Sequence, residues 1–496
     1  MHTLALVQGE TVIEPQRELP VLSKVDVLVA GGGPAGLGAA VAAARTGSST
    51  LLIERNGFLG GVATATMMAI FVMSREHING FSREMVDRMV SRGGAFAGPV
   101  TTFDVESFKE VALEFVEESG VRLLMYSSVV APIMEGNRVR GIVVENKSGR
   151  QAILAKTIID CTGDGDLAAA AGVPMVKGRE SDGKMRPITM LFRLGGVDVR
   201  KLVEYARAHP EDFTPDPNLQ VLDLERGVIR ISGFFSKVDA ARERGELDKD
   251  CYYLRFEGVQ VDKDLVFVNT TRVYGVDGTN ALDLTRAELE ARHQMHQLIR
   301  FIKREIPGCE RAFLIDTSTS LGVRETRRIR GEYVFGEEDV IAHRTFEDTI
   351  LALLRRHTPG QTMHSPDAGE GSNRDEHARD AFNPLTPFEV PYRSLLPLNV
   401  EGLLVAGRSI SQTHEGDMYT RGMYSCMILG QAAGTAGALA VRAGLEPRAV
   451  DRLALQQALV RQGVHLGQQH ARVQATLGSV PVPMPGKASK ERDQQR

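Results

Sequence analysis

The sequence contains few cysteines and none of the patterns in which cysteine binds a metal or forms a redox pair. Its 496 residues include only Cys161, Cys251, Cys309 and Cys426, with no CxxC pair and no zinc-like spacing. We therefore expect no metal site. We also expect these cysteines to be buried free thiols in a reducing compartment, the cytoplasm.

Long apolar runs and blocks of positive charge are also absent. The longest apolar run, residues 67–73, is far too short to cross a bilayer. The N-terminus MHTLALVQGE has neither the basic start nor the sustained apolar core of a secretory signal. A net charge of -4 without a long basic run gives no electrostatic footprint for nucleic acid. We expect a protein that needs neither a membrane nor nucleic acid, with a chain long enough for two or three domains.

The segment VLVAGGGPAGLGAA, residues 27–40, is by contrast dense in glycine. An apolar strand pattern precedes it and an alanine-rich helix pattern follows. Gly31, Gly33 and Gly36 have the G-x-G-x-x-G spacing of a dinucleotide site. We predict that Gly31 makes the tight turn, that Gly33 lets a pyrophosphate approach the backbone, and that Gly36 lets helix and strand pack closely. The amides at the start of the helix would then face the phosphates.

An acid and a second group of glycines follow this unit. Glu54 ends the next buried strand, residues 50–53, where it would bind the adenosine ribose and disfavour a 2′-phosphate. A short NAD-binding unit is expected to continue with a regular helix. In the stretch ERNGFLGGVATAT, however, Gly57, Gly60 and Gly61 interrupt any such helix. We interpret this as space for a larger, extended dinucleotide, FAD.

Three stretches carry a resemblance to a known family. These are ER…GFLGG…AT, TIIDCTGDGD (157–166) and GLLVAGRSISQTHEGDMYTRGMYSCMILGQAAGTAGALA (402–440). Together they resemble the FAD-dependent oxidoreductases of the glutathione-reductase-type, fumarate-reductase-like superfamily, over residues 14–440. The resemblance implies an α/β fold, in which a Rossmann-like FAD-binding domain with a central parallel sheet and a β-meander carries an inserted mixed α+β substrate domain. It also implies that the N-terminus of the small-residue helix after Thr420 faces the flavin N1–C2=O edge. Nothing in the spacing of Cys161 and His414 supports a covalent link to the flavin, so we expect non-covalent FAD.

The motifs and the resemblance together give the candidate cofactor-binding residues. They are Gly31, Gly33, Pro34, Ala35, Gly36, Glu54, Arg55, Gly60, Gly61, Thr64, Val130, Thr162, Gly163, Asp164, Gly407, Arg408, Gly430, Gln431 and Ala432.

Candidate catalytic residues lie in THEGDMYTRG, just before that helix. His414 is the predicted base for a substrate C–H donor, and Glu415 and Tyr419 could share this task. Arg421 could bind a substrate carboxylate or carbonyl through its two parallel N–H groups. The alternative for His414 is a hydrogen bond to the loop or to the flavin ring. Two further interpretations stay open. Arg324, Glu325, Arg327 and Arg328 could form salt bridges between domains or contact the substrate. His77 could lie in an exposed loop or face the substrate cavity.

Changes in residue pattern along the chain predict an FAD-binding domain that is discontinuous in the sequence. We expect an N-terminal arm (1–20), an FAD-binding domain (21–75, 104–172 and 394–445), a substrate or cap domain (76–103 and 173–393), a C-terminal helical segment (446–479) and a flexible tail (480–496). Within the cap domain, residues 358–380 are polar and are expected to form a surface loop.

The predicted function is hydride transfer between flavin N5 and a small organic substrate. A second G-x-G-x-x-G and a CxxC are both missing, which argues against nicotinamide-fed disulfide reduction. The GDAAH-like run of aromatic hydroxylases is also missing, which argues against oxygen insertion. Three alternatives remain open: a flavoprotein subunit passing electrons to another redox protein, a flavin-dependent RNA-modifying enzyme, and a non-redox FAD-binding scaffold. A homo-oligomer or a redox partner protein is compatible with the sequence.

Overall fold

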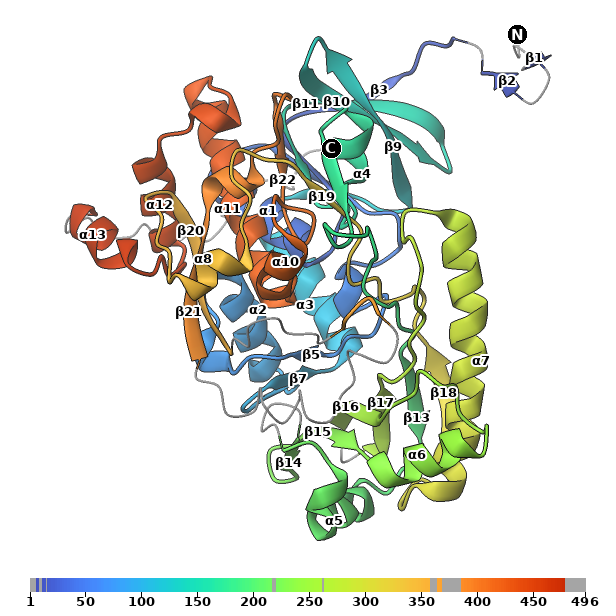
Figure 1. Ribbon diagram of the computed structural model, residues 1–496. Coiled ribbons are helices and arrows are strands. Elements are labelled where there is room, and N and C mark those ends of the chain that lie inside the picture. Colours follow the sequence, from blue (N-terminus) through green and yellow to red (C-terminus); the bar gives the residue numbers. More distant parts are fainter. Residues whose placement is uncertain are drawn as a thin grey trace, which may run out of the picture.

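A seven-stranded sheet forms the centre of the first of two structural regions. The computed structural model describes residues 6–8, 11–14, 16–215, 220–260, 263–356, 364–367 and 385–477 (Figure 1). The sheet has the order β8-β4-β3-β11-β10-β9, with β22 also paired to β11. Its parallel part consists of β3 (Val21–Ala30), β4 (Thr50–Ile53), β8 (Arg122–Leu124), β11 (Gly149–Asp160) and β22 (Leu403–Val405). Two antiparallel strands, β9 (Ser127–Glu135) and β10 (Arg138–Asn146), complete a meander with β11.

Two helices pack against this sheet with their backbones in close approach. Helix α1 (Pro34–Arg45) follows β3, and α11 (Met423–Ala443) comes from near the other end of the chain. A Cβ atom added to Gly430 would lie 1.9 Å from the carbonyl oxygen of Ala35, and one added to Gly38 would lie 2.1 Å from that of Met427. The dense glycine and alanine of both segments therefore serve this helix contact as well as any ligand.

Further elements join the same hydrophobic core. Phe81, Met85 and Phe108 from α2 (Gly80–Ser91) and α3 (Val105–Glu118) pack in it, as do Leu353 and Phe388 from a hairpin. The hairpin is β20 (Thr349–Arg356) with β21 (Leu385–Pro391). Near it lie α8 (Glu337–Ile341), α10 (His414–Thr420), α12 (Arg452–Arg461) and α13 (Gln469–Thr476).

The second region lies below the first in Figure 1 and has its own core, drawn from residues between Ile188 and Ala312. Its six-stranded antiparallel sheet, the cap sheet, has the order β14-β15-β16-β17-β13-β18. Its strands are β13 (Phe192–Gly195), β14 (Val221–Asp223), β15 (Val228–Gly233), β16 (Leu254–Gln260), β17 (Leu265–Val268) and β18 (Phe313–Thr317). Its helices are α5 (Val199–Ala208), α6 (Phe235–Glu243) and the long α7 (Ala281–Glu305).

These elements confirm the α/β class, the central parallel sheet with its meander and the mixed α+β insertion. The domain boundaries stay a prediction, and the packing of two segments bears on how they are proposed. Residues 76–103 include α2, and the end of the predicted cap domain includes β20 and β21; all three pack in the core of the first region. Their apolar residues read equally well as cap or core in the sequence, since periodicity does not identify the surface that a helix or strand covers.

Several short elements lie outside the two large sheets. They are β5 (Ile70–Phe71), β6 (Ala95–Ala97) and β7 (Thr101–Phe103) in one sheet, β12 (Met175–Lys177) paired with β19 (Arg327–Ile329), and α4 (Asp166–Ala170). At the N-terminus, β1 (Leu6–Gln8) pairs with β2 (Thr11–Ile13). The predicted tail, 480–496, lies outside the described residues, as do most of the predicted loop 358–380 and parts of the arm.

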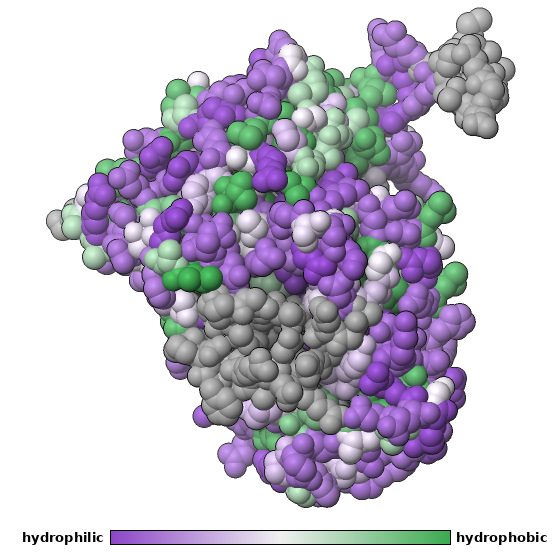
Figure 2. Space-filling view, in the orientation of Figure 1, coloured by the Kyte–Doolittle hydropathy of each residue, from purple (hydrophilic) through white to green (hydrophobic). Residues whose placement is uncertain are grey.

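Helix α11 is long and apolar enough to span a membrane, but 94% of its most apolar stretch is buried inside the protein. A helix that is apolar all round is expected at the centre of a large core. On the face shown in Figure 2, hydrophilic side chains cover most of the described surface, and apolar ones are scattered among them.

Candidate active site

A first cavity, of about 290 Å³, lies at the carboxyl ends of the parallel strands. Gly31 follows β3, Glu54 follows β4, Cys161 follows β11 and Ala406 follows β22, and all four line it. Open α/β sheets bind ligands at this edge, outside the carboxyl ends of their strands. The edge thus brings together four segments that are far apart in the sequence.

The glycines of the first turn have distinct structural roles. Gly31 has φ +105°, and an added Cβ would lie 2.5 Å from the carbonyl oxygen of Cys161. An added Cβ on Gly36 would lie 1.7 Å from the carbonyl oxygen of Gly31, so both glycines allow close backbone packing. Gly33 is different, because the nearest atom to its added Cβ is the Cα of Gly61 at 3.8 Å. Gly33 lines the cavity and is the N-cap of α1, which therefore points its free amides at the space that a phosphate would fill.

Glu54 lines the first cavity but is also held by the protein. Its Oε2 accepts the backbone N–H of Gly32 at 2.8 Å, and its Oε1 accepts the backbone and side-chain N–H groups of Asn56, both at 2.8 Å. An ionised carboxylate has about four acceptor sites, so one is left for a ligand hydroxyl. The contact with a ribose stays a prediction that this geometry permits.

The turn after β11 forms another part of the wall of the first cavity and is held by two aspartates. Asp160 is fully buried at the end of β11, where its two oxygens accept the backbone N–H groups of Thr162 at 3.0 Å and Ala168 at 2.8 Å. Burial raises the pKa of this carboxyl group. Nearby, Asp164 accepts from Arg408 at 2.5 Å and from the hydroxyl of Thr326 at 2.7 Å. These bonds tie the turn after β11 to the turn after β22.

The first cavity brings together most of the predicted cofactor residues. The predicted residues that line it are Gly31, Gly33, Pro34, Ala35, Glu54, Arg55, Gly61, Thr162, Gly163, Asp164, Gly407 and Arg408. Its described lining also includes residues outside the predicted cofactor-binding set, among them Ser127, Val129, Cys161, Met423 and Cys426.

Seven predicted cofactor residues lie elsewhere. Gly36 and Gly430 are packed against backbone, and Gly60 and Thr64 pack against each other. Val130 is 39% exposed, and its neighbour Val129 lines the cavity instead, because successive residues of a strand face opposite sides. The last two are Gln431, which accepts from the backbone N–H of Phe81 at 2.8 Å, and Ala432, which is in the core.

A second cavity, of about 470 Å³, adjoins the first. Six residues line both: Val62, Thr66, Val323, Arg408, Arg421 and Met423. Its other walls come from β5, from the cap sheet and from the turn between α10 and α11. A ligand in the first cavity and a ligand in the second would therefore meet at these shared residues.

The second cavity is rich in arginine. Its described lining holds six arginines and two histidines and no acidic residue; the arginines are Arg230, Arg255, Arg324, Arg355, Arg408 and Arg421. Burial lowers the pKa of Arg421 to about 10 and holds the pKa of Arg324 well below its ordinary value. Burial and the surrounding arginines also hold the pKa of His364 well below its ordinary value, so its imidazole is uncharged near neutral pH.

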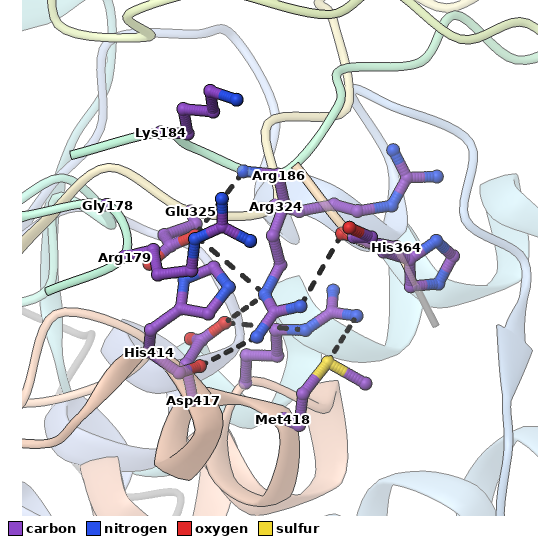
Figure 3. A network of polar contacts seen from close by, with 12 residues as sticks. Gly178, Arg179, Lys184, Arg186, Arg324, Glu325, His364, His414, Asp417 and Met418 are labelled. Carbon is purple, nitrogen blue, oxygen red and sulfur yellow. Dashed lines mark hydrogen bonds and ion pairs between the residues drawn. The ribbon is translucent and has the colours of Figure 1, made fainter. Parts of the chain in front are cut away.

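The predicted catalytic histidine is part of a buried polar network beside this cavity (Figure 3). The Nδ1 atom of His414 lies 2.8 Å from Oε1 of Glu325, and its carbonyl oxygen accepts from Arg186 at 2.7 Å. Arg186 also lies 3.5 Å from Asp417, with both side chains almost completely buried. His414 lines neither cavity, so the structure favours the alternative in which it bonds to its surroundings. The hydrogen bond to Glu325 holds the imidazole on the side away from the cavity.

The other catalytic candidates divide in the same way. Tyr419 packs its ring against Phe335 and Phe388, and neither it nor Glu415 is among the described lining of either cavity. Arg421 lines both cavities, with its Nε 3.5 Å from Oδ2 of Asp417. His77, which the sequence left between loop and cavity, lines the second cavity.

Comparison with known proteins identifies the family of this chain. Residues 26–459 match the family described as FAD dependent oxidoreductase. The chain belongs to this family. It is an FAD-dependent enzyme, and the first cavity fits that cofactor: free amides at the start of α1, a space beside Gly33 that no side chain fills, and Glu54 at the end of β4.

Several solved structures resemble this FAD dependent oxidoreductase at low identity. One is p-nitrophenol 4-monooxygenase from Pseudomonas putida DLL-E4, with a TM-score of 0.46 and 12% identity over 92% of this chain and 94% of that one. Another is a flavin-dependent brominase, with a TM-score of 0.46 and 14% identity over 88% and 83%. A third is a geranylgeranyl bacteriochlorophyll reductase-like protein from Thermoplasma acidophilum, with a TM-score of 0.42 and 14% identity over 92% and 87%.

Proposed function

We propose that this FAD dependent oxidoreductase catalyses hydride transfer between the flavin and a small organic substrate held in the second cavity. The observation that carries the proposal is the pair of adjoining cavities with six shared wall residues. FAD bound along the first cavity would supply the hydride chemistry at its N5 atom. The second cavity has the size of a small-molecule site, for which volumes of about 300–1,000 Å³ are usual.

The residues of the chain have distinct tasks in this proposal. The free amides at the start of α1 bind the pyrophosphate, and Glu54 binds the adenosine ribose. Arg421, held by Asp417, orients the substrate at the boundary between the cavities. The apolar residues of the second cavity exclude water from the reacting atoms. His77 and His364 also line this cavity, and the lowered pKa of His364 keeps its imidazole uncharged at neutral pH.

Several finer assignments belong to the same proposal. The resemblance of the three flavin segments supports membership of the glutathione-reductase-type, fumarate-reductase-like superfamily. Free thiols at all four cysteines support a cytoplasmic location. The arrangement is compatible with non-covalent FAD and with a homo-oligomer or a redox partner protein. The discontinuous domain scheme belongs to the proposal as well, with α2, β20 and β21 assigned to the FAD-binding part because they pack in its core.

The test is anaerobic reduction of the purified yellow protein by a panel of metabolites, followed by mixing with electron acceptors. We expect one class of metabolite to bleach the flavin of the isolated chain, and at least one acceptor to restore it faster than it restores free flavin. If the flavin is bleached only in the presence of another redox protein, the chain is an electron-transfer subunit. If no metabolite bleaches it and no acceptor reoxidises it faster than free flavin, the enzyme proposal is wrong.

A further inference from the structure

Among the described residues, the arginines that line the second cavity outnumber the acids that contact them. Six arginines line it, and three described acids, Asp164, Glu257 and Asp417, lie within 4 Å of them. Glu257 lies 2.9 Å from Arg230 and 3.8 Å from Arg255, while Asp164 and Asp417 contact Arg408 and Arg421. Buried charges in proteins are normally paired, so an excess of cations around a cavity favours an anionic occupant.

Arg324 is the clearest part of this excess. The structure gives it one hydrogen bond, from Nη1 to the backbone carbonyl of Pro187 at 2.5 Å, and no acid within 4 Å among the described residues. A guanidinium has five N–H donors in a planar fork, so donors remain for a ligand. The side chain lines the second cavity and is not among the described lining of the first. Its unused donors therefore serve the substrate side of the site.

The neighbouring arginines are held rigidly in place. Arg230 donates to Glu257 at 2.9 Å, and Asn269 donates to the other oxygen of the same carboxylate at 3.1 Å. Arg255 donates from Nε to the hydroxyl of Ser232 at 3.0 Å. Side chains fixed by such bonds lose little conformational freedom when a ligand arrives, which is how a preorganised site gains affinity.

The remaining wall of the second cavity is apolar. Its described part includes Met68, Ile70, Phe71, Val72, Met73 and Leu191. An inorganic anion would leave this surface uncovered, whereas an organic acid would place its charged group on the arginines and its carbon body on the apolar side chains. Paired N–H groups of arginine match the two oxygens of a carboxylate.

We propose that the substrate of this enzyme is an organic carboxylate with an apolar body, whose carboxylate is bound in the second cavity by Arg324 with support from Arg255 and Arg421. This inference rests on the proposed function, since it names the class of substrate for the same site. It assigns Arg324 as a substrate-binding residue, distinct from the arginines that also reach the first cavity.

The test measures binding to the FAD-loaded protein without turnover. Benzoate and phenylacetate serve as probes, their amides as uncharged controls, and inorganic phosphate as the second anion; binding is followed by calorimetry and by perturbation of the visible flavin spectrum. We expect the carboxylates to bind at least about tenfold more tightly than the amides, the equivalent of one charge-assisted hydrogen bond. Arg324→Gln should remove that preference, and Arg324→Lys should restore part of it. Arg226→Gln, at a position 69% exposed outside the cavity, should leave it unchanged.

Each contrary outcome is distinct. Equal binding of acid and amide, or unchanged carboxylate binding in Arg324→Gln with its flavin content preserved, overturns the proposal. Phosphate binding more tightly than every carboxylate overturns it in favour of a phosphorylated substrate. If an uncharged metabolite bleaches the flavin and no carboxylate binds, the oxidoreductase proposal holds and the carboxylate proposal is wrong. If carboxylates bind but no metabolite bleaches the flavin, the carboxylate-binding site is supported and the oxidoreductase proposal is wrong.

Discussion

The two adjoining cavities are built from different materials. The first is walled largely by backbone and small residues at strand ends, such as Gly31, Gly33 and Gly407. The second is walled by long side chains, arginines on one part and apolar residues on the other. Added side-chain atoms should block binding in the first cavity, because they fill the space beside its backbone. Removal of charged groups should weaken binding in the second cavity, because its arginines would bind the ligand. Substitutions of these two kinds should therefore separate cofactor binding from substrate binding.

Adding atoms at Gly33 should have the largest effect. Gly33→Val places a branched side chain in the first cavity, where nothing else fills the space within 3.8 Å of the new Cβ. The backbone at this position, with φ -76°, suits any residue, so the fold should be kept. We expect overpacking against the cofactor to cost about 3 kcal/mol, which is about 100-fold in the Kd for FAD. The measurements are the flavin content of the purified variant, FAD titration, and far-UV circular dichroism as the control for folding. A folded valine variant with full flavin content would show that the cofactor does not pass Gly33.

Removing charge should discriminate between the two cavities. Arg421 lines both and Arg324 lines only the second, so Arg421→Gln should weaken FAD and carboxylate binding, each by about tenfold, for loss of a charged hydrogen-bond donor. Arg324→Gln should weaken carboxylate binding alone. Asp417 keeps Arg186 as a neighbour at 3.5 Å in the first variant, which limits the cost of the lost partner. FAD and benzoate titrations of both variants provide the check. Equal effects of the two variants on FAD would contradict the division of the arginines.

The helix contact beneath the first cavity gives a smaller effect. Gly430→Ala would place a methyl group 1.9 Å from the carbonyl oxygen of Ala35, forcing α1 and α11 apart at a cost of about 1–3 kcal/mol in the free energy of unfolding. Gly437→Ala on the same helix is the matched control, since its nearest neighbour is the side-chain methyl group of Thr157 at 3.3 Å, a much longer distance than the 1.9 Å at Gly430. Its improved helix propensity, up to about 1 kcal/mol, should offset that contact. Thermal unfolding of both apoproteins tests this, and an equal loss of stability in the two would refute the close helix contact.

The contrast also explains which parts of the site were predictable. Gly31, Gly36 and Glu54 could be found because a positive φ, a close backbone approach and a strand-end acid each demand a residue type at a fixed spacing. The parallel sheet and α1 followed from apolar runs flanking that spacing. The contact of Val130 with the cofactor stays a prediction: its neighbour Val129 lines the first cavity, and the alternation of side chains along an exposed strand does not indicate which face meets a ligand.

The second cavity could not be found in this way. Arg230 and Arg255 lie inside strands β15 and β16, and their convergence depends on how the cap sheet folds over β5. His364 lies in a stretch whose composition indicates only a polar loop. His414 has the right residue type and place in the sequence for a base, but the direction of its side chain is fixed by Glu325, 89 positions away. Tertiary contacts decide such directions, and local patterns do not contain them.

Thiol reactivity gives the finest distinction between the two regions. All four cysteines are buried, and burial raises the pKa of Cys251, Cys309 and Cys426 to about 12 and that of Cys161 well above its ordinary value. At pH 8 the thiolate fraction at a pKa of about 12 is on the order of 1 in 10,000, so Ellman's reagent should label the native holoprotein very slowly and four thiols per chain once it is unfolded in urea.

Removal of FAD should then separate the four thiols into two pairs. Cys161 and Cys426 line the first cavity, whereas Cys251 and Cys309 lie in the core of the second region. The first pair should become accessible in the apoprotein and react faster by about tenfold per pH unit between 7 and 9, since each unit raises the thiolate fraction tenfold below the pKa. The second pair should stay slow. Mass spectrometry of the labelled peptides identifies which thiols have reacted. Labelling of Cys251 at the rate of Cys426 would mean that the second region opens together with the cofactor site, and that the two regions are one unfolding unit.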